Sequence, residues 1–183
     1  MTGQPFPQLT TARLTLRAHE TADFDDLLSL WSDPDVVRYI GGRANTADEV
    51  WSRLLRYRGL WPLLGFGYWR IEDRQTGRYV GDAGLADFRR GLGDGFDESP
   101  ETGWALAPWA HGQGLAGEAM GAILKWADET AEIERTVCMI QPENAASLRL
   151  AGRLGYRPMG QRSFNGSPTQ TFERQRYATS AAP

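Results

Sequence analysis

The spacing of apolar residues predicts alternating strands and helices from the start of the chain. Polar and apolar side chains alternate over residues 13–17, which is the period of a strand with one exposed face. From residue 22 the apolar positions follow the period of an amphipathic helix. A second helix is predicted from Thr46, a candidate N-cap with a glutamate three residues later, and Pro62 and Gly65 are predicted to end it.

The rest of the chain continues this alternation. Two strands flank a short turn that ends in glycine and are predicted to form a hairpin, whereas 89–100 have no pattern and are expected to form a mobile loop. The predicted elements are strands at 66–73, 78–88 and 101–107, a long helix from about 114, a strand at 136–140, a helix at 144–154 and two strands from 156 onward. About seven strands and four helices in this order predict an α+β fold, with a mixed sheet covered by helices.

The composition is that of an ordered chain with a core of its own. The chain has 183 residues, of which 41% are hydrophobic and 23% charged, and its formal net charge is −3. Because no repeat or linker divides it, we expect a single domain at 9–177 and a flexible tail at 178–183. Cys138, in an apolar strand, is expected to be a small core residue, and one cysteine with two histidines supplies neither a disulfide framework nor a metal site.

The sequence also limits location and partners. It contains no run of about eighteen apolar residues for a membrane span, and residues 1–11 lack the basic and apolar pattern of a secretory signal. We therefore expect a cytoplasmic protein that does not bind membranes. Its mildly acidic charge gives no reason to expect nucleic acid, because phosphate neutralisation needs clustered Lys and Arg.

The segment 107–118 carries the clearest chemical signal. A strand stops at Pro108, a loop with Gly112 and Gly114 follows, and the longest helix begins. The first turn of a helix has unpaired amides at the positive end of its dipole, so a phosphate group fits there. The residues at 112–117 also match the G-x-G-x-x-G dinucleotide fingerprint, but they do not follow the first strand of a doubly wound parallel sheet, so their context favours another phosphate ligand.

Several motifs together resemble the GNAT superfamily of N-acetyltransferases. Residues 109–119 are similar to its acyl-CoA pyrophosphate loop, with His111 where the family has Arg or Gln. The N-x-x-S at 144–147 and the L-G-Y at 154–156 are similar to its second signature, and 11–17 resemble the opening strand of the branch that acetylates ribosomal-protein N-termini. This resemblance covers roughly 9–177 and implies a mostly antiparallel sheet that opens beside the strand at 101–107.

The resemblance implies acetyl-CoA as the cosubstrate. Backbone groups of Trp104, Ala105 and Leu106 would bind the pantetheine arm like an added strand, and a backbone amide near Leu106 would stabilise the oxyanion. Asn144 would bind the pantetheine with its side-chain amide. The residues whose amides would hold the diphosphate are Gly112, Gln113, Gly114, Leu115, Ala116 and Gly117, and His111 is the remaining implied cofactor-binding residue. His111 could pair with a phosphate if protonated, although an uncharged surface role fits imidazole better near neutral pH.

The acid and the base are less clearly marked. Glu101, at the start of the opened strand, is the candidate general base, and Asp82 is a weaker second candidate. Many family members have a tyrosine as the general acid at the position of Ala151. Since alanine cannot donate a proton, the resemblance implies Ser147 as the substitute general acid. Tyr156 is expected to pack rather than to donate a proton.

The acceptor is expected to be a primary amine, either a small molecule or a protein N-terminus. Residues 41–67 and 89–100 are expected to shape its cleft, and their acidic residues suit a cationic amine. We interpret Arg53, Arg56 and Arg58 as a solvated helix face. A homodimer is a family-level expectation.

Three functions remain open from the sequence. The favoured one is an acetyl-CoA-dependent N-acetyltransferase in which the amine attacks the thioester directly in a ternary complex. A non-catalytic acyl-CoA-binding or sensor protein on the same fold is the alternative, because Ala151 departs from the family pattern. A nucleotide-dependent oxidoreductase rests on the G-x-G-x-x-G match only.

Overall fold

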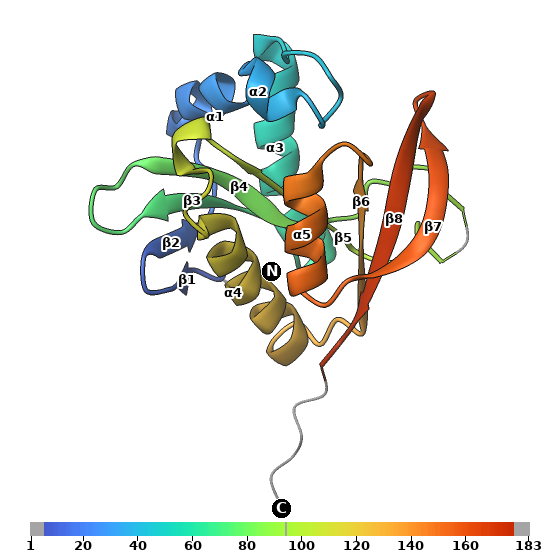
Figure 1. Cartoon of the computed structure of the whole chain (residues 1–183). Helices are drawn as coiled ribbons and strands as arrows, with labels where there is room; N and C mark the ends of the chain where they lie inside the picture. Colours follow the sequence, from blue (N-terminus) through green and yellow to red (C-terminus); the bar gives the residue numbers. More distant parts are fainter. Residues whose placement is uncertain (1–5, 94, 178–183) are drawn as a thin grey trace, which may run out of the picture.

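The fold is a single sheet with helices on both faces (Figure 1). The computed structural model describes residues 6–93 and 95–177, and the expected tail at 178–183 lies outside them. Over this described part, eight strands run in the order β1-β2-β3-β4-β5-β6-β8-β7. The strands are β1 (Leu9–Thr10), β2 (Leu14–Arg17), β3 (Tyr68–Asp73), β4 (Tyr79–Ala86), β5 (Glu101–Leu106), β6 (Arg135–Ile140), β7 (Arg157–Phe164) and β8 (Ser167–Gln175). The α-helices are α1 (Phe24–Trp31), α2 (Pro34–Val37), α3 (Ala47–Leu64), α4 (Leu115–Glu129) and α5 (Ala145–Arg153).

The α+β class and the order of the main elements are confirmed, with two short additions. The strand β1 has two residues, too few for an alternating pattern to show. The helix α2 has four residues and begins at Pro34, where the sequence indicated only an interruption. There the carboxylate of Asp33 accepts a hydrogen bond from the Asp35 amide at 2.9 Å, so the residue before the proline caps a new helix.

The helix α3 begins as predicted and ends at Gly65, the second of the two predicted terminators. Thr46 and Glu49 form the expected capping box at its start. Pro62 does not end the helix, which runs on to Leu64 and stops at Gly65, whose φ is 77°. Because Pro62 lies in the last turn, its missing N–H removes a single helical hydrogen bond.

Two hydrophobic clusters hold the helices on opposite faces of the sheet. The larger cluster packs Met120 and Ile123 of α4 against Trp69 and Ile71 of β3. The other packs the helices α1 to α3 against the opposite face, around Tyr79. Each fully buried large side chain stabilises the fold by about 1.5–3 kcal/mol. Figure 1 shows α4 and α5 in front of the sheet, and α3 lies behind it.

The segment 89–100, residue 94 excepted, contains no helix or strand, as expected for a loop without a pattern, but two of its residues anchor it to the sheet. Leu92 and Phe96 are buried against Val137 of β6. The carboxylate of Asp97 accepts hydrogen bonds from the amides of Gly91 and Gly93 at 3.1 and 2.8 Å. Two apolar residues four apart, in a loop without strand or helix periodicity, provide this anchor.

The sheet opens between β5 and β6. These two strands are parallel and are paired at one position, Glu101 with Val137, whereas every other neighbouring pair in the described sheet is antiparallel. A dinucleotide fold needs a run of parallel strands, so this topology excludes the doubly wound sheet that the glycine fingerprint requires. No helix in the described part of the chain is long and apolar enough to cross a membrane.

Candidate active site

The opened edge of β5 leaves backbone groups without strand partners. The Ala107 amide donates to the Val80 carbonyl at 2.9 Å, which fixes the odd-numbered residues of β5 as those that bond to β4. Trp104 and Leu106 therefore point their backbone groups toward the gap, where β6 has already diverged. Ala105 bonds to Asp82 of β4 instead, so its backbone is not available at the gap.

The helix that follows β5 begins with free amides. Gly112 and Gly114 have φ values of 73° and 77°, and Gly114 is the N-cap of α4. The first amide of the helix with a helical partner belongs to Glu118, which donates to the Gly114 carbonyl at 3.1 Å. The amides of the three preceding residues, Leu115, Ala116 and Gly117, have no acceptor within the helix. They form a site for an anion at the positive end of the helix dipole.

The side chains of His111 and Gln113 hold this glycine loop in place through hydrogen bonds to backbone carbonyls. The imidazole of His111 donates to the Leu106 carbonyl at 2.8 Å, and Gln113 donates to the Trp109 carbonyl at 2.5 Å. The loop therefore presents its backbone to a ligand. His111 is directed at the protein in this structure, which leaves Leu106 with its amide at the gap but its carbonyl occupied.

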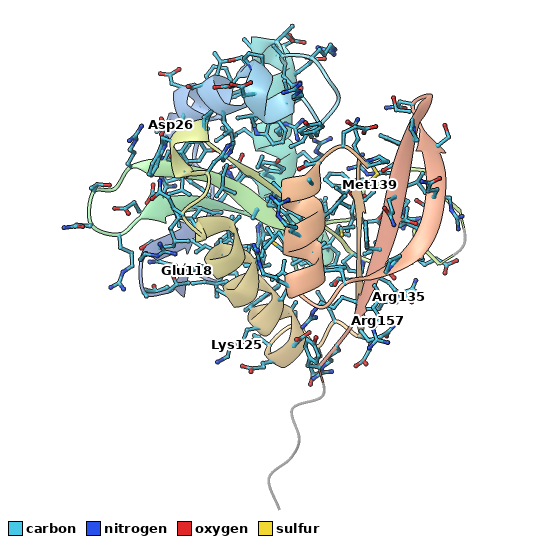
Figure 2. The ribbon with its side chains drawn as sticks, in the orientation of Figure 1. Asp26, Glu118, Lys125, Arg135, Met139 and Arg157 are labelled. Carbon is cyan, nitrogen blue, oxygen red and sulfur yellow. The ribbon has the colours of Figure 1, made fainter. Side chains whose placement is uncertain are left out.

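The loop is also joined to the N-terminal strands. Arg13 forms an ion pair with Glu118 at 2.6 Å and donates to the Gln113 carbonyl at 3.0 Å. Thr11 donates to the same carboxylate at 2.6 Å. Figure 2 shows Glu118 on α4 near β1 and β2. Because Glu118 is neutralised in this way, its charge in the first turn of α4 opposes an anion less.

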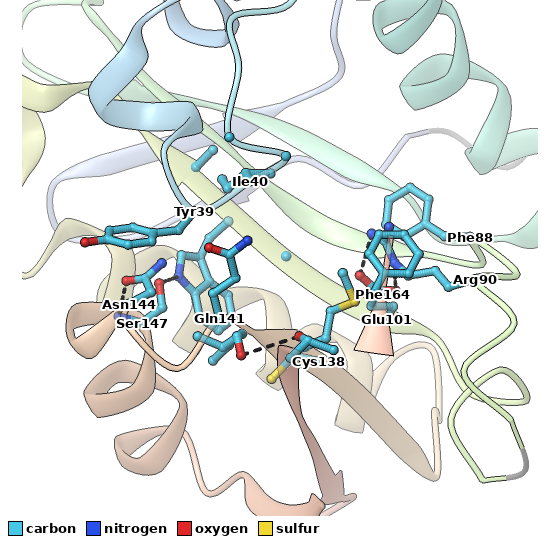
Figure 3. A pocket seen from close by; sticks show the side chains of 18 of the residues that line it. Tyr39, Ile40, Phe88, Arg90, Glu101, Cys138, Gln141, Asn144, Ser147 and Phe164 are labelled. Atoms are coloured by element: carbon cyan, nitrogen blue, oxygen red, sulfur yellow. Dashed lines mark hydrogen bonds and ion pairs between the residues drawn. The ribbon is translucent and has the colours of Figure 1, made fainter. Parts of the chain in front are cut away.

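A cavity of about 610 Å³ lies along the opened edge of β5. It is bounded by the segment before α3, by α3, by β5 and β6, by the start of α5 and by the turn between β7 and β8 (Figure 3). Of the sequence-predicted site residues, Glu101, Trp104, Ala105, Asn144 and Ser147 line it. The glycine loop does not line it, which leaves the anion site and the cavity as two parts of one candidate site joined by β5.

Glu101 is buried at the start of β5 and is held by an arginine. The guanidinium of Arg90 bonds both oxygens of the Glu101 carboxylate, at 2.5 and 2.8 Å. Burial raises the pKa of Glu101 above its usual value, and Arg90 opposes that shift. Each carboxylate oxygen has two acceptor positions, so the pair with Arg90 leaves Glu101 able to accept a further proton.

Ser147, on α5, contacts Trp104, which lies three residues after Glu101 on β5. The indole of Trp104 donates to its hydroxyl oxygen at 3.1 Å, and Ser147 in turn donates its amide to Asn144 Oδ1 at 3.1 Å. The indole bond directs the Ser147 proton elsewhere than toward Trp104. Three residues of a strand span about 10 Å, so Glu101 and the Trp104–Ser147 pair are well separated along β5. Figure 3 shows them at opposite sides of the cavity.

Two of the other residues considered, Asp82 and Tyr156, lie outside the cavity lining, and the third, Cys138, lines the cavity but is almost fully buried. Asp82 is fully buried and accepts hydrogen bonds from His19, Trp31 and Tyr79 at 2.9, 3.0 and 2.7 Å. It does not line the cavity, so the second base candidate is not supported. The Tyr156 hydroxyl bonds to two buried threonines, and burial raises the pKa values of Tyr156 and of the Cys138 thiol.

The arginines of α3 are the main group that the sequence interpretation missed. Arg53 and Arg56 line the cavity. Arg53 is half-buried there, so the prediction of a solvated face is wrong for it, whereas Arg56, at the cavity, and Arg58, outside it, are both exposed as predicted. Arg90 was likewise not predicted, since its partner Glu101 is eleven residues away across a loop. Among the described residues, no group of three or more side chains could hold a metal ion.

Known proteins are similar to this chain in sequence and in fold. The profile of the Acetyltransferase (GNAT) domain matches residues 13–157. The Bacillus subtilis protein YnaD, an uncharacterized N-acetyltransferase, is 28% identical over 156 residues, which are 83% of this chain and 84% of YnaD. The structure of a GnaT-family acetyltransferase from Bordetella pertussis has a TM-score of 0.83 at 38% identity and covers 92% of this chain and 99% of its own.

The fold is shared more widely. A structure of RimL, a ribosomal L7/L12 α-N-protein acetyltransferase in complex with coenzyme A, has a TM-score of 0.75 at 16% identity and covers 92% of this chain and 98% of its own. The likeness to ribosomal-protein acetyltransferases expected from residues 11–17 is thus confirmed for the fold. Fold and family profile together define an acetyltransferase. The chain belongs to the GNAT family.

Proposed function

We propose that this enzyme transfers an acetyl group from acetyl-CoA to a primary amine, which attacks the thioester directly while both substrates are bound. The observation that carries the proposal is the gap between β5 and β6. It leaves the backbone groups of Trp104 and Leu106 without strand partners, a few residues before the free amides of α4. An extended pantetheine arm has the amides to pair with such an edge, and a diphosphate fits such a helix start.

The chain offers donors for the whole length of coenzyme A. Backbone amides from Gly112 to Gly117 would hold the diphosphate, as the GNAT family and the CoA complex of RimL support. Asn144 uses its Oδ1 as the cap of α5, so its side-chain NH₂ remains to donate toward a pantetheine carbonyl. The backbone of Trp104 would pair with the arm itself, and so would the Leu106 carbonyl, which has a second lone pair besides the one that His111 uses.

Glu101 is the proposed general base. A lysine-type amine with a pKa of about 10.4 must lose a proton before it attacks, at a cost of roughly 4–5 kcal/mol at pH 7. A carboxylate in a buried wall of the cavity, with its pKa raised by burial, can take that proton through a water molecule. The amine nitrogen then bonds to the acetyl carbon.

The Leu106 amide and Ser147 complete the proposed chemistry. The Leu106 amide points into the gap, where it can donate to the oxyanion of the tetrahedral intermediate. When the carbon–sulfur bond breaks, the thiolate can take a proton from the Ser147 hydroxyl, whose oxygen already accepts from Trp104. The second proton, which the attacking nitrogen loses as the amide forms, then restores the Ser147 hydroxyl. Ala151, where many relatives have a tyrosine, is fully buried in the core and leaves this role to Ser147.

Two measurements test the proposal in order. Calorimetry with coenzyme A should show binding to the purified protein, and acetyl-CoA with a panel of amines should release free thiol. Absence of CoA binding would contradict the proposal at its first step. Binding without thiol release for any amine would instead favour the non-catalytic acyl-CoA sensor.

A further inference from the structure

The charge of the cavity lining is the opposite of the one expected from the sequence. Among the described residues that line it, four are arginines, and Glu101 is the single acid. Two acidic residues of 41–67 and 89–100, Glu49 and Asp97, do not line the cavity. Glu49 pairs with Arg43, and Asp97 binds loop amides. With Glu101 neutralised by Arg90, nothing acidic in this lining is left to attract a polyamine or an aminoglycoside.

Arg53 is held in place as a binding group. Its guanidinium carbon lies 3.6 Å from the centroid of the Trp31 ring, and it donates to Asn45 Oδ1 at 3.1 Å and to the Tyr57 hydroxyl at 3.3 Å. Trp31 is fixed in turn, because its indole donates to the buried Asp82. The planar guanidinium is thereby preorganised on a rigid aromatic face.

This fixed guanidinium has no carboxylate partner among the residues that the structure describes. Arginine has five N–H donors, and two of those of Arg53 are used, both by neutral acceptors. Its Nε is buried without an acceptor in the described part of the chain. One N–H of each terminal nitrogen is also without an acceptor in that part of the chain, so an acceptor that reaches these donors from the cavity would stabilise the site.

Arg56 brings a second guanidinium to the same wall. Its guanidinium carbon lies 5.3 Å from the centroid of the Phe88 ring, and that of Arg90 lies 4.4 Å from the same centroid. No ion pair or hydrogen bond joins Arg56 to another described side chain. Burial, with the like charges of Arg53 and Arg90, lowers the pKa of Arg56, which is what an anion between these groups would relieve.

Given the acetyl transfer proposed above, we infer that the acceptor is a small amine that also carries a carboxylate, as amino acids do, and that Arg53 and Arg56 bind this carboxylate. The guanidinium fork matches a carboxylate in a bidentate geometry. The amine end of such an acceptor would lie toward Glu101 and the gap beside Trp104. A cavity of about 610 Å³ that also admits the thioester end of acetyl-CoA suits a small acceptor.

The test compares acceptors that differ in one charge. The twenty amino acids and a series of ω-amino acids of increasing length are each assayed for thiol release beside the matching carboxamides, spermine and short C-terminally amidated peptides with free N-termini. At least one carboxylate-bearing amine should have a kcat/KM about tenfold or more above that of its own carboxamide, the size expected for one charge-assisted hydrogen bond. Equal or better turnover of the amides, of spermine or of the peptides would overturn the inference.

Variants then assign the binding group. Arg56→Gln, at the rim of the cavity, should raise KM for the acid about tenfold without changing KM for the amide or the Kd for coenzyme A. Arg53→Lys, which keeps the charge but loses the fork, should raise the same KM. Arg58→Gln is the matched control on the same helix and should leave every constant unchanged. Unchanged KM values in both Arg56→Gln and Arg53→Lys would overturn the assignment, and Arg56→Gln keeps the test valid if Arg53 variants do not fold.

Binding separates this inference from the proposed function. If the protein binds coenzyme A but acetylates none of the amines, thermal stabilisation of the CoA complex by the same acids and amides is measured. Stabilisation by an acid and not by its amide supports the carboxylate site even though acetyl transfer has failed. Stabilisation by no acid overturns the carboxylate site, whereas absence of CoA binding contradicts only the function proposed above.

Discussion

Gly114 is the residue at which the proposed CoA site depends most on backbone conformation. Its φ of 77° lies in the left-handed region, which costs a residue with a Cβ about 1–2 kcal/mol. Space is not the obstacle, because a Cβ there would meet no atom closer than Arg13 Nη2 at 3.7 Å. Gly114→Ala should therefore keep the fold and let the loop relax to a conformation that no longer directs its amides at a common anion.

The magnitude follows from the strain that coenzyme A must then restore. If binding has to return the loop to its strained form, the binding free energy for coenzyme A becomes less favourable by that roughly 1–2 kcal/mol. The Kd then rises about fivefold to thirtyfold. Calorimetry with coenzyme A measures it. Gly114→Trp, with a bulky side chain beside the amides, should abolish binding altogether while thermal unfolding still shows a folded protein.

Gly121→Ala is the matched control. Gly121 lies within α4, seven residues later, and a Cβ there meets nothing within 4 Å. Alanine should stabilise the helix by roughly 0.5–1 kcal/mol and leave the Kd unchanged. An unchanged Kd in Gly114→Ala, or an equal loss in both variants, would refute the assignment of the loop to the diphosphate.

The other predictions concern the proposed base, the proposed acid and the buried support of the cavity. Glu101→Gln should lower turnover by about 10²-fold or more near pH 6, where the carboxylate takes a proton that the ammonium keeps, and the deficit should shrink as pH approaches the pKa of the amine; a pH-independent deficit in the thiol-release profile would contradict the role of base. Ser147→Ala should lower kcat about 10²-fold at an unchanged Kd for coenzyme A, and a normal kcat would exclude Ser147 as the acid. Asp82→Ala should lower the free energy of unfolding by about 3–5 kcal/mol in denaturant titrations, since it leaves three buried donors unpaired, against less than about 1 kcal/mol for Asp25→Ala on the surface of α1. Similar losses in the two aspartate variants would show that the buried network is not a main support.

Local signals in the sequence were sufficient for the glycine loop and for the start of α5. Gly112 and Gly114 have the left-handed φ values that their type allows, and Asn144 caps the helix that contains Ser147. These features depend on residues within a few positions of one another. The capping box of α3 was predicted for the same reason. For the end of α3 the sequence offered both Pro62 and Gly65, and the helix ends at Gly65.

The walls of the cavity could not be predicted because they depend on contacts between distant segments. Arg53 is on α3 and rests on Trp31 of α1, so helical periodicity alone gives it an exposed place. The turn between β7 and β8 lines the cavity only because β8 pairs with β6. The sign of the charge in the cavity follows from these placements and not from the composition of any one segment.

The most direct test of the central claim is a crystal structure with bound coenzyme A. The diphosphate should lie within hydrogen-bond distance, about 2.7–3.2 Å, of backbone amides between Gly112 and Gly117, with the pantetheine arm paired to Trp104 and Leu106. A coenzyme A molecule bound elsewhere, with the start of α4 and the edge of β5 both unused, would contradict it.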